Sequence, residues 1–415
     1  MRKVDDYGWS GYLQANPRPS YSLTNTRVSW SPRARAYYDA QTDVAWTCPK
    51  FIARPLSDPW NERLLPALAI NHSRLVVAAG DTIYSYKFAV PSREQESPPV
   101  TVEGQCRLSS LFSPRPDITA ITFVDNDHTL YIAYQDGSLE RATVVEPSME
   151  RKSPFSLDRH KVDLPDQLPG DFVRSLSSSR NCLLSLTASG HATLSLADPA
   201  LASPSSIELN TRSWTSYLCL RAPCPYAAFG TSSTTPLTVH AISEGGLRAQ
   251  PIAILQPKKP ITSSAVYGIA QAPTSSPWGS SPQILVSGWF DGLVRCFDLR
   301  SSTRSSDMDQ SIYGCAPLKP VLSLYDPLSD ETIYSVSCGG GFSSHIAAGA
   351  ARHSVVSFWD VRALKKSWSV HAPGNDSSPV YSIVLESSRL FGVTQSRPFV
   401  YDFVRLFWNA PPDAH

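Results

Sequence analysis

Short apolar runs alternate with turn-forming residues along most of the chain. The clearest example is the segment ILVSGWFDGLVRCFDLRS at residues 284–301, where two apolar runs flank Asp291 and Gly292. An Asp-Gly pair between two such runs favours a tight turn in which glycine takes a positive φ. The segment therefore predicts a β-hairpin with Asp291 and Gly292 at its tip.

Six further copies of this strand-turn-strand pattern occur along the chain. The seven units lie at residues 73–88, 118–145, 172–198, 213–242, 261–301, 333–362 and 380–403. The second unit repeats the Asp-Gly turn at Asp136 and Gly137. The last three units end in an aromatic residue followed by Asp, in the pairs Phe297-Asp298, Trp359-Asp360 and Tyr401-Asp402. Repeats of about 50 residues, each forming a small antiparallel sheet, predict an all-β, seven-bladed β-propeller.

The repeats resemble those of the WD40 family over residues 50–403. The resemblance rests on the motifs Asp291-Gly292, Phe297-Asp298 and Trp359-Asp360. It implies a WD40-type propeller that holds a protein or peptide partner. Ser287, Asp291 and Phe297 match three positions of the family's buried hydrogen-bond network. The family's Gly-His pair before the inner strand is missing, so we expect that network to be incomplete.

Residues 1–48 predict a helical segment that precedes the propeller. Ser31 can cap a helix and Pro32 suits its first position, so we expect a helix over residues 32–46. A Trp, an Arg-rich helix, a second Trp and a first strand follow in an order that resembles the connector of F-box/WD-repeat proteins. That resemblance implies a substrate receptor of an SCF ubiquitin ligase, attached through a Skp1-type adaptor. No F-box is recognisable in residues 1–30, and a helix that only caps the propeller is the alternative.

The first and last sheets of a propeller must be joined if no sheet edge is to stay open. The last unit ends near Phe403, and Pro411 and Pro412 disfavour another strand in the C-terminal tail, residues 404–415. Residues 49–55 have a short extended core. We therefore expect this N-terminal segment to supply the outer strand of the last blade.

The composition agrees with many short strands and narrows the classes of partner. The chain of 415 residues is 42% hydrophobic and contains 35 Pro and 21 Gly, which favours strands joined by loops. Its 37 Lys and Arg against 36 Asp and Glu leave a net charge of +1, so we expect neither direct nucleic-acid binding nor membrane association. The N-terminal region lacks an apolar signal core, which predicts an intracellular protein, cytoplasmic or nuclear.

Sequence motifs of common enzymes are missing. GxSxG, HExxH, GxxxxGKS/T and GxGxxG do not occur, and the eight cysteines contain no CxxC pair. We therefore predict a non-enzymatic interaction scaffold with no cofactor and no metal. The alternatives left open are an assembly scaffold in an RNA or chromatin complex and a propeller enzyme, which the absence of a convergent acid, base or metal set disfavours.

Partner contacts are expected at turn tips on one end of the propeller. The candidates are Gln135, Trp289, Phe290, Arg352, His353 and Arg397. Trp289 and Phe290 are large aromatics of the kind found in binding hot spots, although either can fold back onto a neighbouring blade. The arginines and His353 offer positive charge to an acidic or phosphorylated peptide. The residues expected to be structural, at turns and strand ends, are Asp136, Gly137, Ser287, Asp291, Gly292, Phe297, Asp298, Trp359, Asp360, Tyr401 and Asp402.

Overall fold

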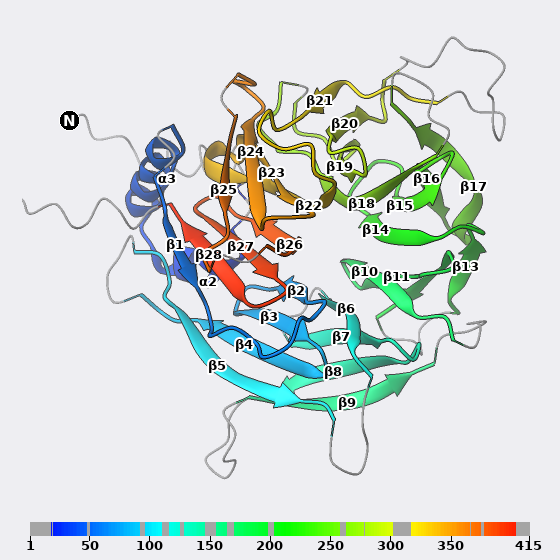
Figure 1. The fold of residues 1–415 in the computed structure, drawn as a ribbon, viewed down its shortest axis with the longest axis horizontal. Coiled ribbons are helices and arrows are strands. Elements are labelled where there is room, and N and C mark those ends of the chain that lie inside the picture. The colour runs from blue at the N-terminus through cyan, green and yellow to red at the C-terminus, as the bar shows by residue number, and fades with distance from the viewer. Residues whose placement is uncertain are drawn as a thin grey trace, which may run out of the picture.

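The chain forms an all-β propeller, in which antiparallel sheets stand around a central axis (Figure 1). The computed structural model describes residue 18 and residues 20–47, 50–91, 96–109, 116–124, 128–145, 155–163, 170–197, 203–257, 263–277, 279–301, 317–365, 367–374 and 377–403. The predicted C-terminal tail at residues 404–415, as well as residues 1–17 and 48–49, lie outside the described residues. Within the described residues, five sheets have four strands each and a sixth has eight.

Four of the four-stranded sheets follow the chain in simple order. The first is β2 (Ala67–Ile70), β3 (Arg74–Ala79), β4 (Thr82–Phe88) and β5 (Val100–Arg107). The second is β6 (Ile118–Phe123), β7 (Thr129–Tyr134), β8 (Leu139–Val145) and β9 (Ser156–Val162). The third is β10 (Val173–Ser179), β11 (Cys182–Thr187), β12 (His191–Leu196) and β13 (Ser205–Glu208). The fourth is β22 (Ile333–Gly339), β23 (His345–Ala350), β24 (Val355–Asp360) and β25 (Ser367–His371).

The eight-stranded sheet consists of two antiparallel four-stranded halves. One half is β14 (Ser213–Cys219), β15 (Tyr226–Ser233), β16 (Leu237–Ser243) and β17 (Gly246–Leu255). The other half is β18 (Ser264–Gln271), β19 (Ile284–Trp289), β20 (Val294–Asp298) and β21 (Leu322–Leu324). The halves are joined where the end of β15 pairs with the start of β18, through Ser232 with Ala265 and Ser233 with Ser264. Each half thus repeats the strand order of the separate sheets.

The last sheet contains strands from both ends of the propeller. It consists of β26 (Val380–Leu385), β27 (Arg389–Thr394), β28 (Pro398–Asp402) and β1 (Ile52–Pro55). β1 pairs antiparallel with β28, with Ile52 opposite Asp402 and Pro55 opposite Phe399. The N-terminal segment therefore supplies the outer strand, as its extended core predicts. This pairing covers the edge of β28 that would otherwise be open to another chain.

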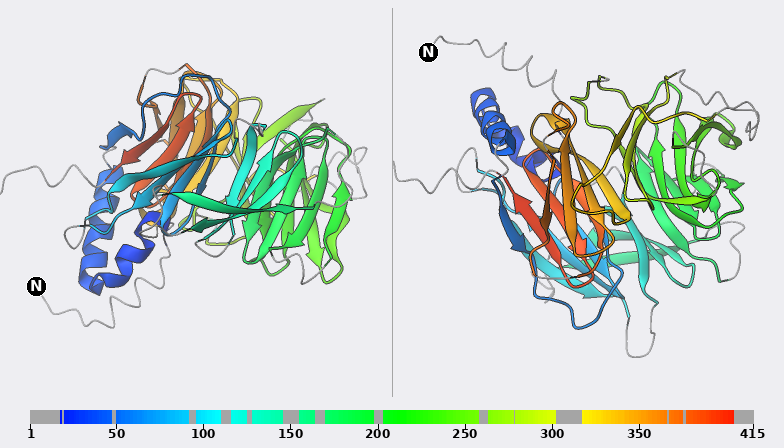
Figure 2. Two further views of the ribbon diagram at one scale, coloured as in Figure 1. Left: turned by 90° about the horizontal axis from the view of Figure 1, so that it is seen from below. Right: turned by 45° about the horizontal axis from the view of Figure 1, so that its top comes forward.

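The N-terminal helices pack against the last sheet at the periphery of the ring (Figure 2). They are η1 (Tyr21–Leu23), α2 (Thr24–Ser29) and α3 (Pro32–Thr47), and a further turn, η4 (Gly340–Ser344), joins β22 to β23. The predicted helix is confirmed: it begins at Pro32, and Ser31 Oγ accepts a hydrogen bond from the Ala34 amide at 3.2 Å. At its other end Trp46 stacks on Phe403 at a centroid distance of 3.8 Å.

The hydrophobic core lies between neighbouring sheets. Val76 of the first sheet belongs to one buried cluster with Ile132 of the second. Val286 of β19 belongs to another with Ile346 of β23. Because both faces of most sheets are covered, the middle strands β3, β7, β19, β23 and β27 are mostly apolar and are buried at every position.

Candidate functional site

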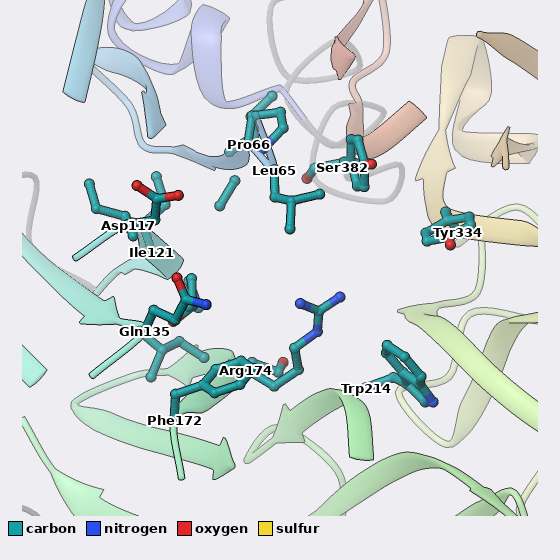
Figure 3. Close-up of a pocket in the computed structure, with 18 of the residues that line it drawn as sticks. Leu65, Pro66, Asp117, Ile121, Gln135, Phe172, Arg174, Trp214, Tyr334 and Ser382 are labelled. Carbon is teal, nitrogen blue, oxygen red and sulfur yellow. The ribbon is translucent and has the colours of Figure 1, made fainter. Parts of the chain in front are cut away.

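The strands nearest the central axis are the first strands of the sheets, and six of them carry a β-bulge at equivalent positions near their N-terminal ends. These six are β6, β10, β14, β18, β22 and β26. In each of them one residue is skipped in the pairing with the next strand, and such a residue can be redirected away from the sheet. The skipped residues are Thr119, Arg174, Trp214, Tyr267, Tyr334 and Tyr381. All six line one cavity of about 300 Å³ at the mouth of the central channel (Figure 3). We call this cavity the mouth pocket.

Four of these side chains form a continuous aromatic wall. The ring centroids are 4.9 Å apart between Trp214 and Tyr267, and 5.2 Å apart between Tyr267 and Tyr334, which are stacked. Tyr334 then meets Tyr381 edge to face at 5.9 Å. Two polar contacts hold the ends of this wall: Trp214 Nε1 donates to Ser232 Oγ at 2.7 Å, and Gln395 Nε2 donates to Tyr381 Oη at 2.9 Å. The wall is therefore fixed before any ligand arrives.

Two guanidinium groups lie over the indole at one end of this wall. The Arg174 guanidinium carbon is 5.2 Å from the Trp214 ring centroid and that of Arg212 is 4.2 Å from it. Arg174 extends into the open space of the mouth pocket (Figure 3). Among the described residues neither guanidinium group has a carboxylate within ion-pair distance or a hydrogen-bond acceptor.

The electrostatic environment of Arg174 disfavours its positive charge. Burial lowers the pKa of this guanidinium, the phenols of Tyr334 and Tyr381 oppose that shift, and the nearby Arg212 charge adds to it. A partly desolvated cation without a counter-charge is unfavourable in a folded protein unless a ligand completes it. The geometry therefore suits an anionic group, which the guanidinium can bind through two parallel hydrogen bonds.

The wall opposite Trp214 comes from the first two sheets and the segment before them (Figure 3). Leu65 and Pro66 lie at the end of the β1–β2 connection, and Gln135 lies at the β7–β8 turn. The backbone amide of Gln135 donates a hydrogen bond to the Asp117 carbonyl at 2.9 Å, which fixes the position of this residue. Its side chain is exposed and available to a ligand. Gln135 is thus the predicted partner-binding residue that the structure places in the mouth pocket.

The prediction that Trp289 contacts a partner is wrong. Trp289 is the last residue of β19 and is 0% exposed, because it faces the core rather than the turn tip. Its Nε1 donates to Ser287 Oγ at 2.8 Å, and the Arg295 guanidinium lies 4.6 Å from its ring centroid. The next residue, Phe290, is 59% exposed and keeps the exposure expected of a docking residue.

The remaining candidates lie at turns outside the mouth pocket. Arg352 is exposed and lies 3.7 Å from Glu331, and His353 is exposed with a positive φ of 59°. Arg397 is half-buried and packs over Gly374, whose φ of 120° and lack of a side chain permit that close approach. The structure does not bring these three into the mouth pocket, so contact between them and a partner stays a prediction.

Sequence reasoning missed the main residues of the mouth pocket, although the sequence contains a signal for them. Five of the six bulge positions lie in the triplets VRS (173–175), SWT (213–215), VYG (266–268), IYS (333–335) and VYS (380–382). Each triplet places Arg or an aromatic residue between two smaller residues near the start of an inner strand. Comparison of the repeats at this position, rather than at the turn tips, identifies Arg174, Trp214 and the three tyrosines.

The Asp-Gly turns are structural, as expected. Asp136 accepts hydrogen bonds from the amide and hydroxyl of Ser138 at 2.9 and 2.6 Å, and Gly137 has a φ of 88°. Asp291 binds the Arg295 guanidinium through both carboxylate oxygens, at 2.9 and 2.6 Å, and Gly292 has a φ of 78°. These positive φ values explain why glycine occupies both turns.

The aspartates at strand ends also stabilise local structure. Asp298 accepts from the backbone and side chain of Arg300, and these hydrogen bonds lower the pKa of the Asp298 carboxyl. Asp360 repeats this arrangement with Arg362, whose guanidinium donates at 3.1 and 2.9 Å. Asp402 is instead buried and pairs with Arg389 at 3.2 Å. The aromatic partners Phe297, Trp359 and Tyr401 are buried beside them.

Among the described residues no group of three or more His, Cys, Asp and Glu side chains is placed to hold a metal ion. The helices in the described part of the chain are all too short or too polar to cross a membrane.

Comparisons with known proteins identify the fold. No protein-family model matches the chain, and no curated protein matches it. Among solved structures, the chain is similar to the crystal structure of the computationally designed Ika8 protein, with a TM-score of 0.51 and 15% sequence identity. The match covers 84% of this chain and 99% of the Ika8 chain. At this identity the similarity shows the β-propeller fold alone.

Proposed function

We propose that this protein is a non-enzymatic interaction scaffold that binds a segment of a protein partner at the mouth pocket. The observation that carries this proposal is the Arg174 guanidinium, which lies over Trp214 and has no counter-charge among the described residues. An acidic or phosphorylated side chain of the partner supplies that charge, and the aromatic wall covers the neighbouring part of the segment. Binding energy of this kind needs no catalytic group.

We also propose that the propeller is seven-bladed and of the WD40 type. The eight-stranded sheet counts as two blades in this proposal because only two residue pairs join its halves. Asp291-Gly292 and Trp359-Asp360 support the assignment to the WD40 type. We further propose that the protein acts inside the cell, as an assembly scaffold for other proteins.

Affinity purification with quantitative mass spectrometry tests the mouth pocket. The tagged full chain is compared with Arg174→Ala and with Arg248→Ala, a control that removes an exposed arginine from the outer strand β17. We expect Arg174→Ala to deplete a specific partner at least about tenfold, a loss of roughly 1.4 kcal/mol of binding energy, while Arg248→Ala retains it. Equal recovery by all three chains contradicts the proposal.

A substrate receptor of an SCF-type ubiquitin ligase is a more specific form of this function. The firm docking of α3 supports it, because Trp46 Nε1 donates to the Ser387 carbonyl at 2.8 Å and a helix fixed in this way can transmit the position of an adaptor. Recovery of a Skp1-type adaptor and a cullin in the same purification is the expected result. Recovery of a partner that depends on Arg174, without an adaptor or a cullin, supports the scaffold function and contradicts the role as a ligase subunit.

A further inference from the structure

A second depression, of about 1010 Å³, adjoins the mouth pocket. Gly80 and Asp117 line both, so the two form a continuous surface. One side of this depression is the connection at residues 56–66 between β1 and β2, and the other side is formed by β4 and β5. We call it the blade-one groove.

The blade-one groove is preformed. Backbone amides of the connection donate to the last sheet, from Leu56 to the Pro398 carbonyl at 2.9 Å and from Trp60 to the Ser396 carbonyl at 2.8 Å. Gly80, which has a φ of 60° that favours glycine, is in van der Waals range of the Leu64 side chain of the connection. The shape of the groove therefore does not depend on a ligand.

The charge of the blade-one groove is opposite to that of the mouth pocket. Four carboxylates line it, those of Asp58, Glu62, Asp81 and Asp117, and the one cation among the described lining residues is Arg107. Arg107 is already paired with Asp81 at 3.0 Å. Asp58 and Asp117 have no ion pair among the described residues. The groove therefore has excess negative charge beside the positive charge of Arg174 and Arg212.

Aromatic side chains in the groove provide a surface for a cation. The Trp60 and Tyr84 rings lie 5.7 Å apart, and both line the groove. Trp60 Nε1 is buried and has no hydrogen-bond partner among the described residues. Aromatic faces next to carboxylates attract Lys and Arg side chains, whose alkyl portions also pack on the rings.

From this charge complementarity we infer that the bound partner segment is an extended peptide with two charges of opposite sign. Its acidic or phosphorylated side chain lies on Arg174, and a Lys or Arg side chain farther along lies in the blade-one groove against Trp60 and the carboxylates. The inference rests on the proposed function of the mouth pocket and adds the second recognition element. It predicts that the partner is selected by the order and spacing of two charges.

Two oriented peptide libraries test this inference on the full chain. One has a fixed phosphoserine and the other a fixed glutamate, and both have degenerate flanking positions. Bound peptides are sequenced for the natural chain, for Glu62→Gln/Asp117→Asn, and for the control Asp158→Asn/Glu244→Gln, which changes two exposed carboxylates outside the groove. We expect Lys or Arg to be enriched about three- to fivefold at one or two positions on one side of the fixed anion. The enrichment disappears in the groove variant and persists in the control.

The outcomes separate this inference from the function on which it rests. Retention of fixed-anion peptides above the library with fixed serine, without enrichment of Lys or Arg, contradicts the role of the blade-one groove and leaves the proposed function of the mouth pocket intact. Enrichment of Lys or Arg that persists in Glu62→Gln/Asp117→Asn also contradicts the role of the blade-one groove. Failure of both fixed-anion libraries to exceed a library with fixed serine overturns the proposed function and the inference together. The better of the two anions identifies whether a carboxylate or a phosphate is the preferred group.

Discussion

Two arginines of this propeller are in opposite electrostatic situations. Arg389, on β27 beneath the N-terminal helices, is 2% exposed and pairs with Asp402, which is 0% exposed, at 3.2 Å. Arg174, at the mouth of the channel, has no such partner among the described residues. Where the chain closes on itself, buried charge is matched within the molecule. Where the channel opens, the positive charge of Arg174 has no counter-charge among the described residues, and this difference distinguishes the structural ion pair of the last sheet from the proposed binding site.

Other groups beneath the helices follow the rule of internal matching. Glu386 accepts a hydrogen bond from the Ser22 amide at 2.7 Å and another from the Ser22 hydroxyl. Tyr38 donates to Ser388 Oγ at 2.9 Å. The β26–β27 turn that contains Glu386 and Ser388 is buried as a result. The N-terminal helices therefore complete the fold of the last sheet, whatever else they attach to.

The largest expected effect is the difference in stability between Arg389→Ala and Arg174→Ala. Arg389→Ala removes the ion pair with the buried Asp402 carboxylate and keeps the longer one with Arg54, at 4.0 Å, so it should lower the free energy of unfolding by about 3–5 kcal/mol. Arg174→Ala should change it by less than about 1 kcal/mol, because no ion pair is lost. Urea denaturation at pH 7 measures both values.

Equal destabilisation by the two substitutions would break the comparison, since it would mean that Arg174 is as structural as Arg389. Arg389→Lys sharpens the result: it keeps the charge beside Asp402 but not the two-pronged geometry, so we expect an intermediate loss.

A smaller effect is expected within the repeats themselves. Asp291→Ala removes two bonds to Arg295 and should destabilise the propeller by about 1–2 kcal/mol. Asp136→Ala should have a smaller effect, because the hydrogen bonds of the exposed Asp136 carboxylate among the described residues come from the amide and hydroxyl of Ser138 in its own turn and not from a charged group. Thermal unfolding of the two variants gives the order. The reverse order would show that the Asp291–Arg295 pair contributes little to stability.

The repeats could be predicted from sequence because their causes are local. Asp-Gly turns and an N-terminal Ser-Pro pair act over a few residues, and Gly292 and Pro32 are each found in the predicted conformation. The mouth pocket depends on bulges in strands that are far apart in sequence, so the contact of Arg174 with Trp214 was not predicted. Trp289 was misassigned for a related reason. A shift of one residue between strand end and turn tip moves a side chain from core to solvent, and Phe290 occupies the exposed position.

The smallest effect concerns the pH dependence of stability at Glu386, beneath the N-terminal helices. Burial raises the pKa of Glu386, while the hydrogen bonds from Ser22 and the charges of Arg389 and Arg27 oppose the shift. A carboxyl whose pKa is higher in the folded than in the unfolded chain stabilises the fold most below its unfolded value of about 4.3 and loses that contribution as the pH rises through the folded value. The free energy of unfolding of the natural chain, relative to that of Glu386→Gln, should therefore increase as the pH falls from 8 to 5. Asp298→Asn is the matched control, since the pKa of Asp298 is lowered and its contribution is lost only on further acidification, as the pH falls through the folded pKa. The opposite result is a stability difference between the natural chain and Glu386→Gln that decreases toward pH 5. In that case the hydrogen bonds from Ser22 and the charges of Arg389 and Arg27 outweigh burial, and Glu386 is stabilised as an ionised carboxylate, as Asp402 is by Arg389.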